Sequence, residues 1–294
     1  MNIDISQIKA KRYGKYSPDR QEKNRYKSVE LFELAIFYRF NHLLEFLNEL
    51  DPKIHQRFIS QHTSTIRSMV ETNYVQEKAI DLPKILEKFE HLQNYPDLAE
   101  LVFNLTIKLY NLPPETNWEG EEIEILAKNF YRGLLFQAYY QLLTLTELMN
   151  RKEAIDLFIK HGEVYVLTHP RVSKIDALEE FWKSTTDLAD GDEEVRIISE
   201  IINGKFIIRR ETCLWSEILK EAEDSELAYF VCCYGDYVSC KARNEHFVLT
   251  RNHSLLQGYA YCDKVFHDIR IDPDISHPSK EFFDKYGQKY NKLV

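Results

Sequence analysis

Residues 194–211 read EVRIISEIINGKFIIRRE, and this stretch decides the fold class of the second half of the chain. Two runs rich in β-branched residues, 194–202 and 205–211, are separated by Asn203-Gly204. An Asn-Gly pair between two β-rich runs accepts the positive φ angles of a type I′ turn. The pattern therefore predicts a tight antiparallel hairpin.

The sequence on either side of the hairpin predicts a mixed region of short strands and helices. Further strands are expected at 246–251 and 263–270, and helices at 175–187, 214–222 and 225–239. No strand–helix–strand series recurs, which argues against a parallel doubly wound sheet. We therefore expect an antiparallel sheet with helices packed on it.

The first half of the chain has the pattern of a helical bundle. Glycine is absent from 15–119, and apolar residues recur at helical spacing. The expected helices are 28–50, 54–74, 84–93, 97–111, 121–148 and 151–166. The fold prediction is α+β, with a helical N-terminal half packed on a small antiparallel sheet in the C-terminal half.

Four regions follow from these patterns. The predicted boundaries are a basic arm at 1–27, a helical bundle at 28–168, an α+β region at 169–270 and a polar tail at 271–294. The arm has an excess of lysine and arginine. It is expected to be solvated or draped on the surface, and binding of an anionic partner is the alternative.

Composition narrows the class of protein. The net charge of −9 argues against nonspecific binding to nucleic acid or to an anionic membrane. No apolar run is long enough to span a bilayer, and the N-terminus lacks the apolar core of a signal peptide. These features predict a cytoplasmic protein and leave self-association open.

All five cysteines, from Cys213 to Cys262, lie within residues 213–270, which are about a fifth of the chain. Their odd number and local spacing predict free thiols. Glycine-rich phosphate loops, zinc-binding helices, paired Cys-x-x-Cys spacing and the Gly-x-Ser-x-Gly elbow are all missing. What remains is Cys213, Cys232-Cys233-Tyr-Gly-Asp236, Leu249-Thr250-Arg251, Ser254-Leu255 and Gly258-Tyr-Ala-Tyr-Cys262-Asp263, followed by His267-Asp268.

This series resembles the L-2-amino-thiazoline-4-carboxylic acid hydrolase family. That family's pattern has a leading Cys, Cys-x-x-Asp, a strand ending in Thr-Arg, a Ser-Leu turn, Gly and Cys-Asp, in this order. The matching segment covers about 60 residues and also resembles, more distantly, domains of the 4-vinyl reductase type. Some of those domains bind zinc, but the Glu-x-x-Cys half of their pattern is absent here. No metal and no cofactor are therefore predicted.

The resemblance implies hydrolysis of a small cyclic amidine to an N-carbamoyl amino acid. The catalytic candidates are Cys233, Asp236, Cys262 and Asp263, and the substrate-binding candidates are Arg251, Cys213, His253 and His267. A thiolate or a base would deliver the nucleophile, a carboxylate would stabilise the protonated amidine, and Arg251 would grip the substrate carboxylate.

Several alternatives stay open at this level. Arg251 could instead form a buried ion pair with Asp236 or Asp263, and Asp236 is either a general base or a hydrogen-bonding group at a helix end. Cys232 and Cys233 are adjacent on an expected helix, so only one is expected to line a site. His253 and His267 are structural or acid–base residues. The competing functions are a binding or sensor module without chemistry and an enzyme acting on another small heterocycle.

Overall fold

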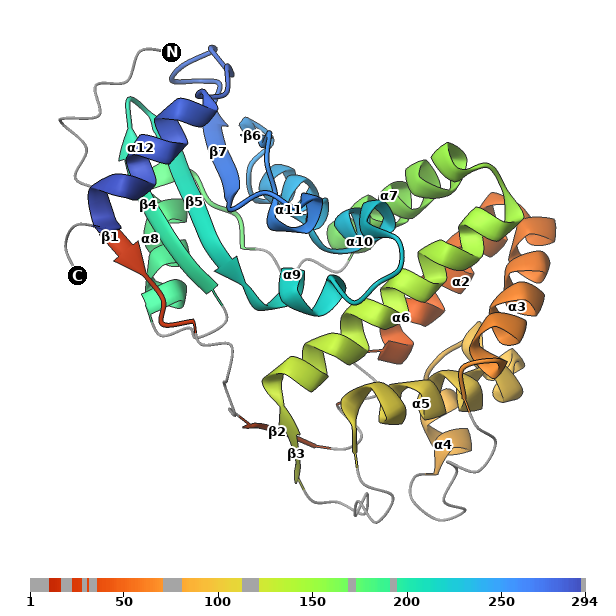
Figure 1. Ribbon diagram of the computed structural model, residues 1–294. Coiled ribbons are helices and arrows are strands. Elements are labelled where there is room, and N and C mark those ends of the chain that lie inside the picture. Colours follow the sequence, from red (N-terminus) through yellow and green to blue (C-terminus); the bar gives the residue numbers. More distant parts are fainter. Residues whose placement is uncertain are drawn as a thin grey trace. The chain divides into compact units, whose positions relative to one another are not determined.

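The computed structural model divides the chain into two compact units, which are described separately (Figure 1). One unit is Gln21–Tyr165, and the other joins Met1–Arg20 to Val166–Val294. The structure describes residues 11–16, 23–27, 31, 36–70, 81–112, 122–168, 173–190 and 195–291.

Gln21–Tyr165 is mainly helical, as predicted. Its helices are α2 (Tyr38–Leu50), α3 (Pro52–Arg67), α4 (Leu82–Leu86), η3 (Leu92–Asn94), α5 (Pro96–Tyr110), α6 (Ala127–Leu148) and α7 (Arg151–Thr168), which continues past the boundary of the unit. Asp51 caps α3 by accepting a hydrogen bond from the backbone N–H of Lys53 at 2.8 Å. Helices α5 and α6 approach closely, because a Cβ on Gly133 would lie 2.1 Å from the ring of Tyr110.

A two-stranded ribbon in this unit was not predicted. Strand β2 (Lys23–Lys27) pairs antiparallel with β3 (Glu122–Leu126). The prediction of a helix from residue 121 was wrong at its start, because Ile123 and Ile125 are buried while their neighbours are exposed or half-buried. This period of two is a strand pattern. The part of the expected basic arm in β2 is thus paired with β3, and its side chains Lys23, Arg25 and Lys27 are exposed.

The other unit contains a five-stranded antiparallel sheet. Its strands are β1 (Lys11–Tyr13), β4 (Val195–Ile202), β5 (Lys205–Cys213), β7 (Cys262–Asp268) and β6 (Phe247–Thr250), in that spatial order. Asn203 and Gly204 have φ angles of 50° and 70° between β4 and β5, which confirms the predicted hairpin turn. Strand β1 also comes from the expected arm and closes one edge of the sheet.

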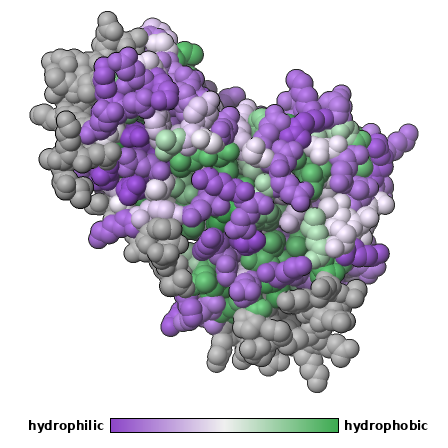
Figure 2. Space-filling model, viewed as in Figure 1, coloured by the Kyte–Doolittle hydropathy of each residue, from purple (hydrophilic) through white to green (hydrophobic). Residues whose placement is uncertain are grey.

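Helices cover both faces of this sheet (Figure 1). Helices α8 (Leu178–Asp190) and α11 (Gly235–Arg243) pack on one face, over a core that includes Phe206 and Phe266. Helix α12 (Lys280–Asn291) packs on the opposite face, over Ile207 and Val265. The side of α12 that faces the viewer in Figure 2 is mainly hydrophilic.

The prediction of a polar tail at 271–294 was wrong for α12, which packs on the sheet. Phe282, Phe283 and Tyr286 are all buried against the sheet. Their spacing places them on one side of a helix, although the segment as a whole is polar. Burial of these three aromatic side chains against the apolar face of the sheet stabilises the helix, although the local sequence pattern predicts it only weakly.

The α+β class is confirmed, with helices in the N-terminal half and an antiparallel sheet in the C-terminal half. None of the helices that the structure describes combines the length and the apolarity needed to cross a membrane.

Candidate functional site

A small, partly enclosed cavity in the sheet unit is lined by residues from most of the predicted motif. Its volume is about 10 Å³, which is room for about one water molecule. The lining residues are Arg210, Cys213, Trp215, Ser216, Cys232, Cys233, Asp236, Arg251, Cys262 and Lys264. They come from β5, β7, the end of β6 and the helices α9 (Leu214–Leu219), α10 (Ser225–Cys232) and α11.

The local sequence explains why Cys233 reaches this cavity. Asp224 caps α10 by accepting hydrogen bonds from the backbone N–H groups of Glu226 and Leu227, each at 3.1 Å. The helix ends at Cys232, and α11 begins at Gly235. The single helix expected at 225–239 was therefore wrong.

The break between these helices changes which thiols reach the cavity. Cys233 is the C-terminal cap residue of α10, and Asp236 lies in the first turn of α11. Both Cys232 and Cys233 line the cavity, so the expectation that only one of them would do so was also wrong. The two thiols share a hydrogen bond.

Strand pairing brings Arg210, Cys262 and Lys264 together. Arg210 pairs directly with Cys262 across β5 and β7, so the two side chains lie on the same face of the sheet. Lys264 follows Cys262 by two positions and shares that face. Cys213 lies at the end of β5, where its sulfur accepts a hydrogen bond from Arg210 Nη1 at 3.5 Å.

Asp236 is clamped between two cations. Its Oδ2 accepts hydrogen bonds from Arg251 Nη2 and from Lys264 Nζ, the latter at 2.6 Å. Burial alone would raise the pKa of Asp236, but the charges of Lys264, Arg251 and Arg210 hold it far below its usual range. A carboxylate held so strongly in its ionised form is a poor general base.

The guanidinium of Arg251 makes its hydrogen bonds to other groups of the protein. Besides Asp236, it donates to the backbone carbonyl of Cys233 at 3.0 Å, and its side chain is 1% exposed. The sequence left open whether this guanidinium grips substrate or forms a buried ion pair, and the structure has the ion pair with Asp236. Its position fixes Cys233 and Asp236 relative to each other.

Arg210 differs from Arg251 and Lys264 in having no ion pair with a carboxylate among the described residues. Its Nε is buried without a hydrogen-bond partner, and in the described part of the chain no carboxylate lies within ion-pair distance of its guanidinium. Among the described residues that line the cavity, Asp236 supplies the single carboxylate that faces Arg210, Arg251 and Lys264. This excess of positive charge favours a thiolate or an anionic ligand in the cavity.

The thiols respond differently to these charges. The hydrogen bond from Cys232 lowers the pKa of Cys233 against the opposing effect of burial, and Arg251 and Lys264 lower it further. The same hydrogen bond raises the pKa of Cys232. Burial, followed by the neighbouring Cys233, raises the pKa of Cys262 to about 11. The lowered pKa of Cys233 favours its thiolate, whereas the raised pKa values of Cys232 and Cys262 favour their neutral thiols.

Asp263, His253 and His267 do not join this cavity. Asp263 and His267 alternate with Cys262 and Lys264 along β7 and so point to the opposite face, toward α12. Asp263 is fully buried, and its Oδ1 accepts hydrogen bonds from the backbone N–H groups of Asn252 and His253 at 2.8 and 2.7 Å. Catalytic or substrate-binding roles for these three residues in the cavity are thus contradicted by their positions.

The polar residues on the opposite face contact one another in a continuous network instead. Lys205 contacts His267 Nδ1 at 3.3 Å, and His267 Nε2 contacts Thr250 Oγ1 at 2.9 Å. Thr250 Oγ1 contacts His277 Nδ1 at 2.8 Å, and His277 Nε2 lies 3.3 Å from Asp263 Oδ2.

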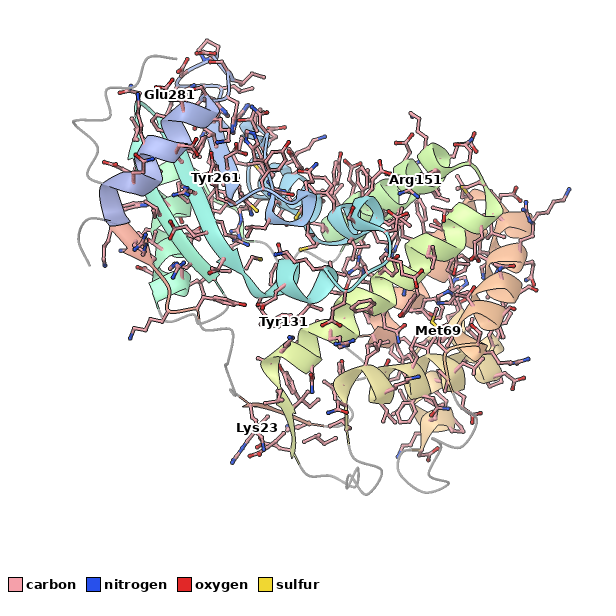
Figure 3. The ribbon with its side chains drawn as sticks, in the orientation of Figure 1. Lys23, Met69, Tyr131, Arg151, Tyr261 and Glu281 are labelled. Atoms are coloured by element: carbon pink, nitrogen blue, oxygen red, sulfur yellow. The ribbon has the colours of Figure 1, made fainter. Side chains whose placement is uncertain are left out.

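The residues at the two ends of this network make further contacts with the protein. Asp263 Oδ2 also contacts His253 Nδ1 at 2.5 Å, and Lys205 pairs with Asp272 at 2.9 Å. Figure 3 labels Tyr261, whose hydroxyl donates to Asp284 of α12 at 2.9 Å. These contacts tie the loops after β6 and β7, and α12, to the sheet.

The structure brings together Cys213, Cys233, Asp236, Arg251 and Cys262 of the predicted site residues. Arg210 and Lys264 were missed. Lys264 could have been identified from sequence, because side chains two residues apart on a strand share a face and Lys264 follows Cys262 by two. Identifying Arg210 requires the register between strands. All five cysteines are free. Within the described residues, no group of three or more His, Cys, Asp or Glu side chains is arranged to hold a metal ion.

Comparisons with protein-family models, with curated proteins and with solved structures found no match to this chain.

Proposed function

We propose that the protein is a thiol-dependent hydrolase that opens a small cyclic amidine, such as a 2-amino-thiazoline carboxylate, to an N-carbamoyl amino acid. The observation that carries the proposal is the convergence of Cys233, Asp236, Arg251 and Cys262 on one cavity, together with two further cations. These residues are the ones that the resemblance singles out, and they come from separate elements of the fold.

Cys233 is the proposed nucleophile. Its thiolate adds to the amidine carbon, the carbon–sulfur bond of the ring breaks, and the ring sulfur leaves as a thiolate. Water then adds to the same carbon and expels the Cys233 thiolate, which leaves the carbamoyl group on the amino acid. The hydrogen bond from Cys232 and the charges of Arg251 and Lys264 favour the thiolate that this step needs.

The charges of the cavity suit this chemistry. Asp236 holds Lys264 and Arg251 in place and presents a negative charge to the protonated amidine. Arg210 has no carboxylate partner among the described residues and is the proposed anchor of the substrate carboxylate. Arg210 thus takes the role of binding the substrate carboxylate that was expected for Arg251. Arg251 is instead a positioning residue.

The size of the cavity limits what it can enclose. A volume of about 10 Å³ holds a water molecule or the reacting atom but not a whole thiazoline ring. The rest of the substrate must therefore lie at the cavity mouth, or side chains must move aside as it binds.

Turnover of a panel of five-membered cyclic amidines, with and without a carboxylate, tests the proposal. The expected result is release of one thiol per ring opened for a carboxylated thiazoline and much slower release for its carboxylate-free analogue. Saturable binding without thiol release would instead identify a binding or sensor module. Turnover only of rings without sulfur would identify an enzyme acting on another heterocycle.

A further inference from the structure

The cavity combines three features that favour thiol oxidation. Four of the five cysteines line it, three cations line it with them, and its volume is that of about one water molecule. Peroxides react with thiolates rather than thiols, and positive neighbours stabilise the thiolate. Hydrogen peroxide is little larger than water, so it is an oxidant of suitable size for this space.

We propose that Cys233 is a site of oxidation by hydrogen peroxide, and that Cys262 resolves the oxidised form as a Cys233–Cys262 disulfide. This inference does not depend on the proposed hydrolase activity, because it concerns the thiols alone.

The first step oxidises Cys233. Its thiolate attacks one oxygen of the peroxide, the O–O bond breaks, and the departing hydroxide takes up a proton and leaves as water. Cys233 becomes a sulfenic acid, having lost two electrons to the peroxide. Arg251 holds the backbone of Cys233 through its carbonyl at 3.0 Å, which keeps the sulfur at the cavity.

The second step uses Cys262. Its sulfur loses a proton and attacks the Cys233 sulfur, the S–O bond breaks, and hydroxide leaves with that proton as water. In the resting protein, burial and then the neighbouring Cys233 keep the Cys262 thiol protonated. Oxidation of Cys233 to a neutral sulfenic acid removes the second of these causes, while Lys264 and Arg210 still favour a Cys262 thiolate.

The other cysteines are less suitable partners for Cys233. Cys232 is adjacent in sequence, so the two Cα atoms are about 3.8 Å apart, which is shorter than disulfide geometry prefers. Cys213 accepts a hydrogen bond from Arg210 and interacts electrostatically with Cys232. Cys240 is the buried residue of α11 that packs into the core of the sheet unit, and it does not line the cavity.

The experiment treats the reduced full-length protein with one to two equivalents of hydrogen peroxide and then counts thiols in denaturant. We expect loss of two of the five thiols, a Cys233–Cys262 disulfide by peptide mass mapping, and recovery of both thiols with dithiothreitol. Cys262→Ser should lose one thiol and accumulate a sulfenic acid at Cys233 that dimedone traps. Cys233→Ser should lower the oxidation rate about tenfold or more.

Cys240→Ser is the matched control and should react like the wild-type protein. A disulfide between another pair, equal oxidation rates for Cys233→Ser and the wild type, or no dimedone adduct in Cys262→Ser would each overturn the proposal. Thermal melting shows whether each variant is folded. The peptide map of the wild-type protein keeps the proposal testable if a variant is not.

Discussion

Arg210 and Cys262 lie directly opposite each other on β5 and β7, on the same face of the antiparallel sheet. This register places a guanidinium without a carboxylate partner, among the described residues, beside a thiol at the start of the strand. The following residue, Asp263, faces away and pairs with His253. One strand therefore separates a cationic thiol cavity on one face from a histidine–carboxylate network on the other.

Arg210 is expected to determine affinity for the anionic group of the substrate. Arg210→Gln should raise KM about 10- to 100-fold with a smaller change in kcat, because a hydrogen bond to a charged group contributes about 1.5–3 kcal/mol. Arg209→Gln is the control, since Arg209 is the adjacent strand residue and stacks over Tyr261 on the opposite face, at 4.4 Å from its ring centre. Steady-state kinetics that show equal KM increases in both variants would contradict this role.

Arg251 is expected to contribute to stability through its buried ion pair. Arg251→Met should lower the free energy of unfolding by about 2 kcal/mol, because it removes a charged hydrogen bond to Asp236 and leaves Lys264 as the remaining partner. Urea denaturation measures this change. The double variant Arg251→Met, Asp236→Asn should be less destabilised than the sum of the single variants, and simple additivity would argue against direct coupling.

His267 is expected to make the sheet unit sensitive to acid. Burial, followed by the charge of Lys205, lowers the pKa of His267 to about 4. The unfolded chain therefore binds this proton first, and stability falls as the pH drops from about 6.5 toward 4. Between pH 7 and pH 5, His267 should account for a loss of about 2 kcal/mol.

Denaturation of the wild type and His267→Gln at both pH values tests this prediction. The variant should be less stable at pH 7, because Lys205 and Thr250 lose a partner, but should show a correspondingly smaller loss at pH 5. An unchanged pH dependence would show that another group carries the acid sensitivity.

Helix α12 is expected to be an integral part of the sheet unit. Phe283 is fully buried between the sheet and the helix, so Phe283→Ala should cost about 3–5 kcal/mol of unfolding free energy. The exposed neighbour Glu281 supplies a control, because Glu281→Ala should change stability by less than about 0.5 kcal/mol. Similar small effects in both variants would mean that α12 detaches at little cost.

The hairpin around Asn203-Gly204 could be predicted from sequence because its turn chemistry and its strand patterns agree. Both residues have the positive φ angles that the dipeptide favours. Helix α12 and strand β3 could not be predicted as readily. Phe283 signals a helix only once the face that buries it is known, and Ile123 belongs to a strand that is too short to outweigh the helical pattern that follows.

The candidate site was partly predictable for similar reasons. Cys233, Asp236 and Arg251 stand out as chemical groups in a compact pattern, and they converge on the cavity. The prediction did not assign alternate residues of β7 to opposite faces of the sheet, and it therefore grouped Asp263 with Cys262. Arg210 depends on long-range strand register, which the local sequence does not specify.

The initial rate of ring opening by Cys233→Ser, relative to the wild type and to Cys240→Ser, tests the central claim most directly. Cys240 is buried in the core away from the cavity, so it controls for the loss of a buried thiol. With a carboxylated 2-amino-thiazoline as substrate, we expect Cys240→Ser to retain activity while folded and Cys233→Ser to lose about a thousandfold or more in kcat. A folded Cys233→Ser protein within about threefold of the wild-type rate would contradict nucleophilic catalysis by Cys233.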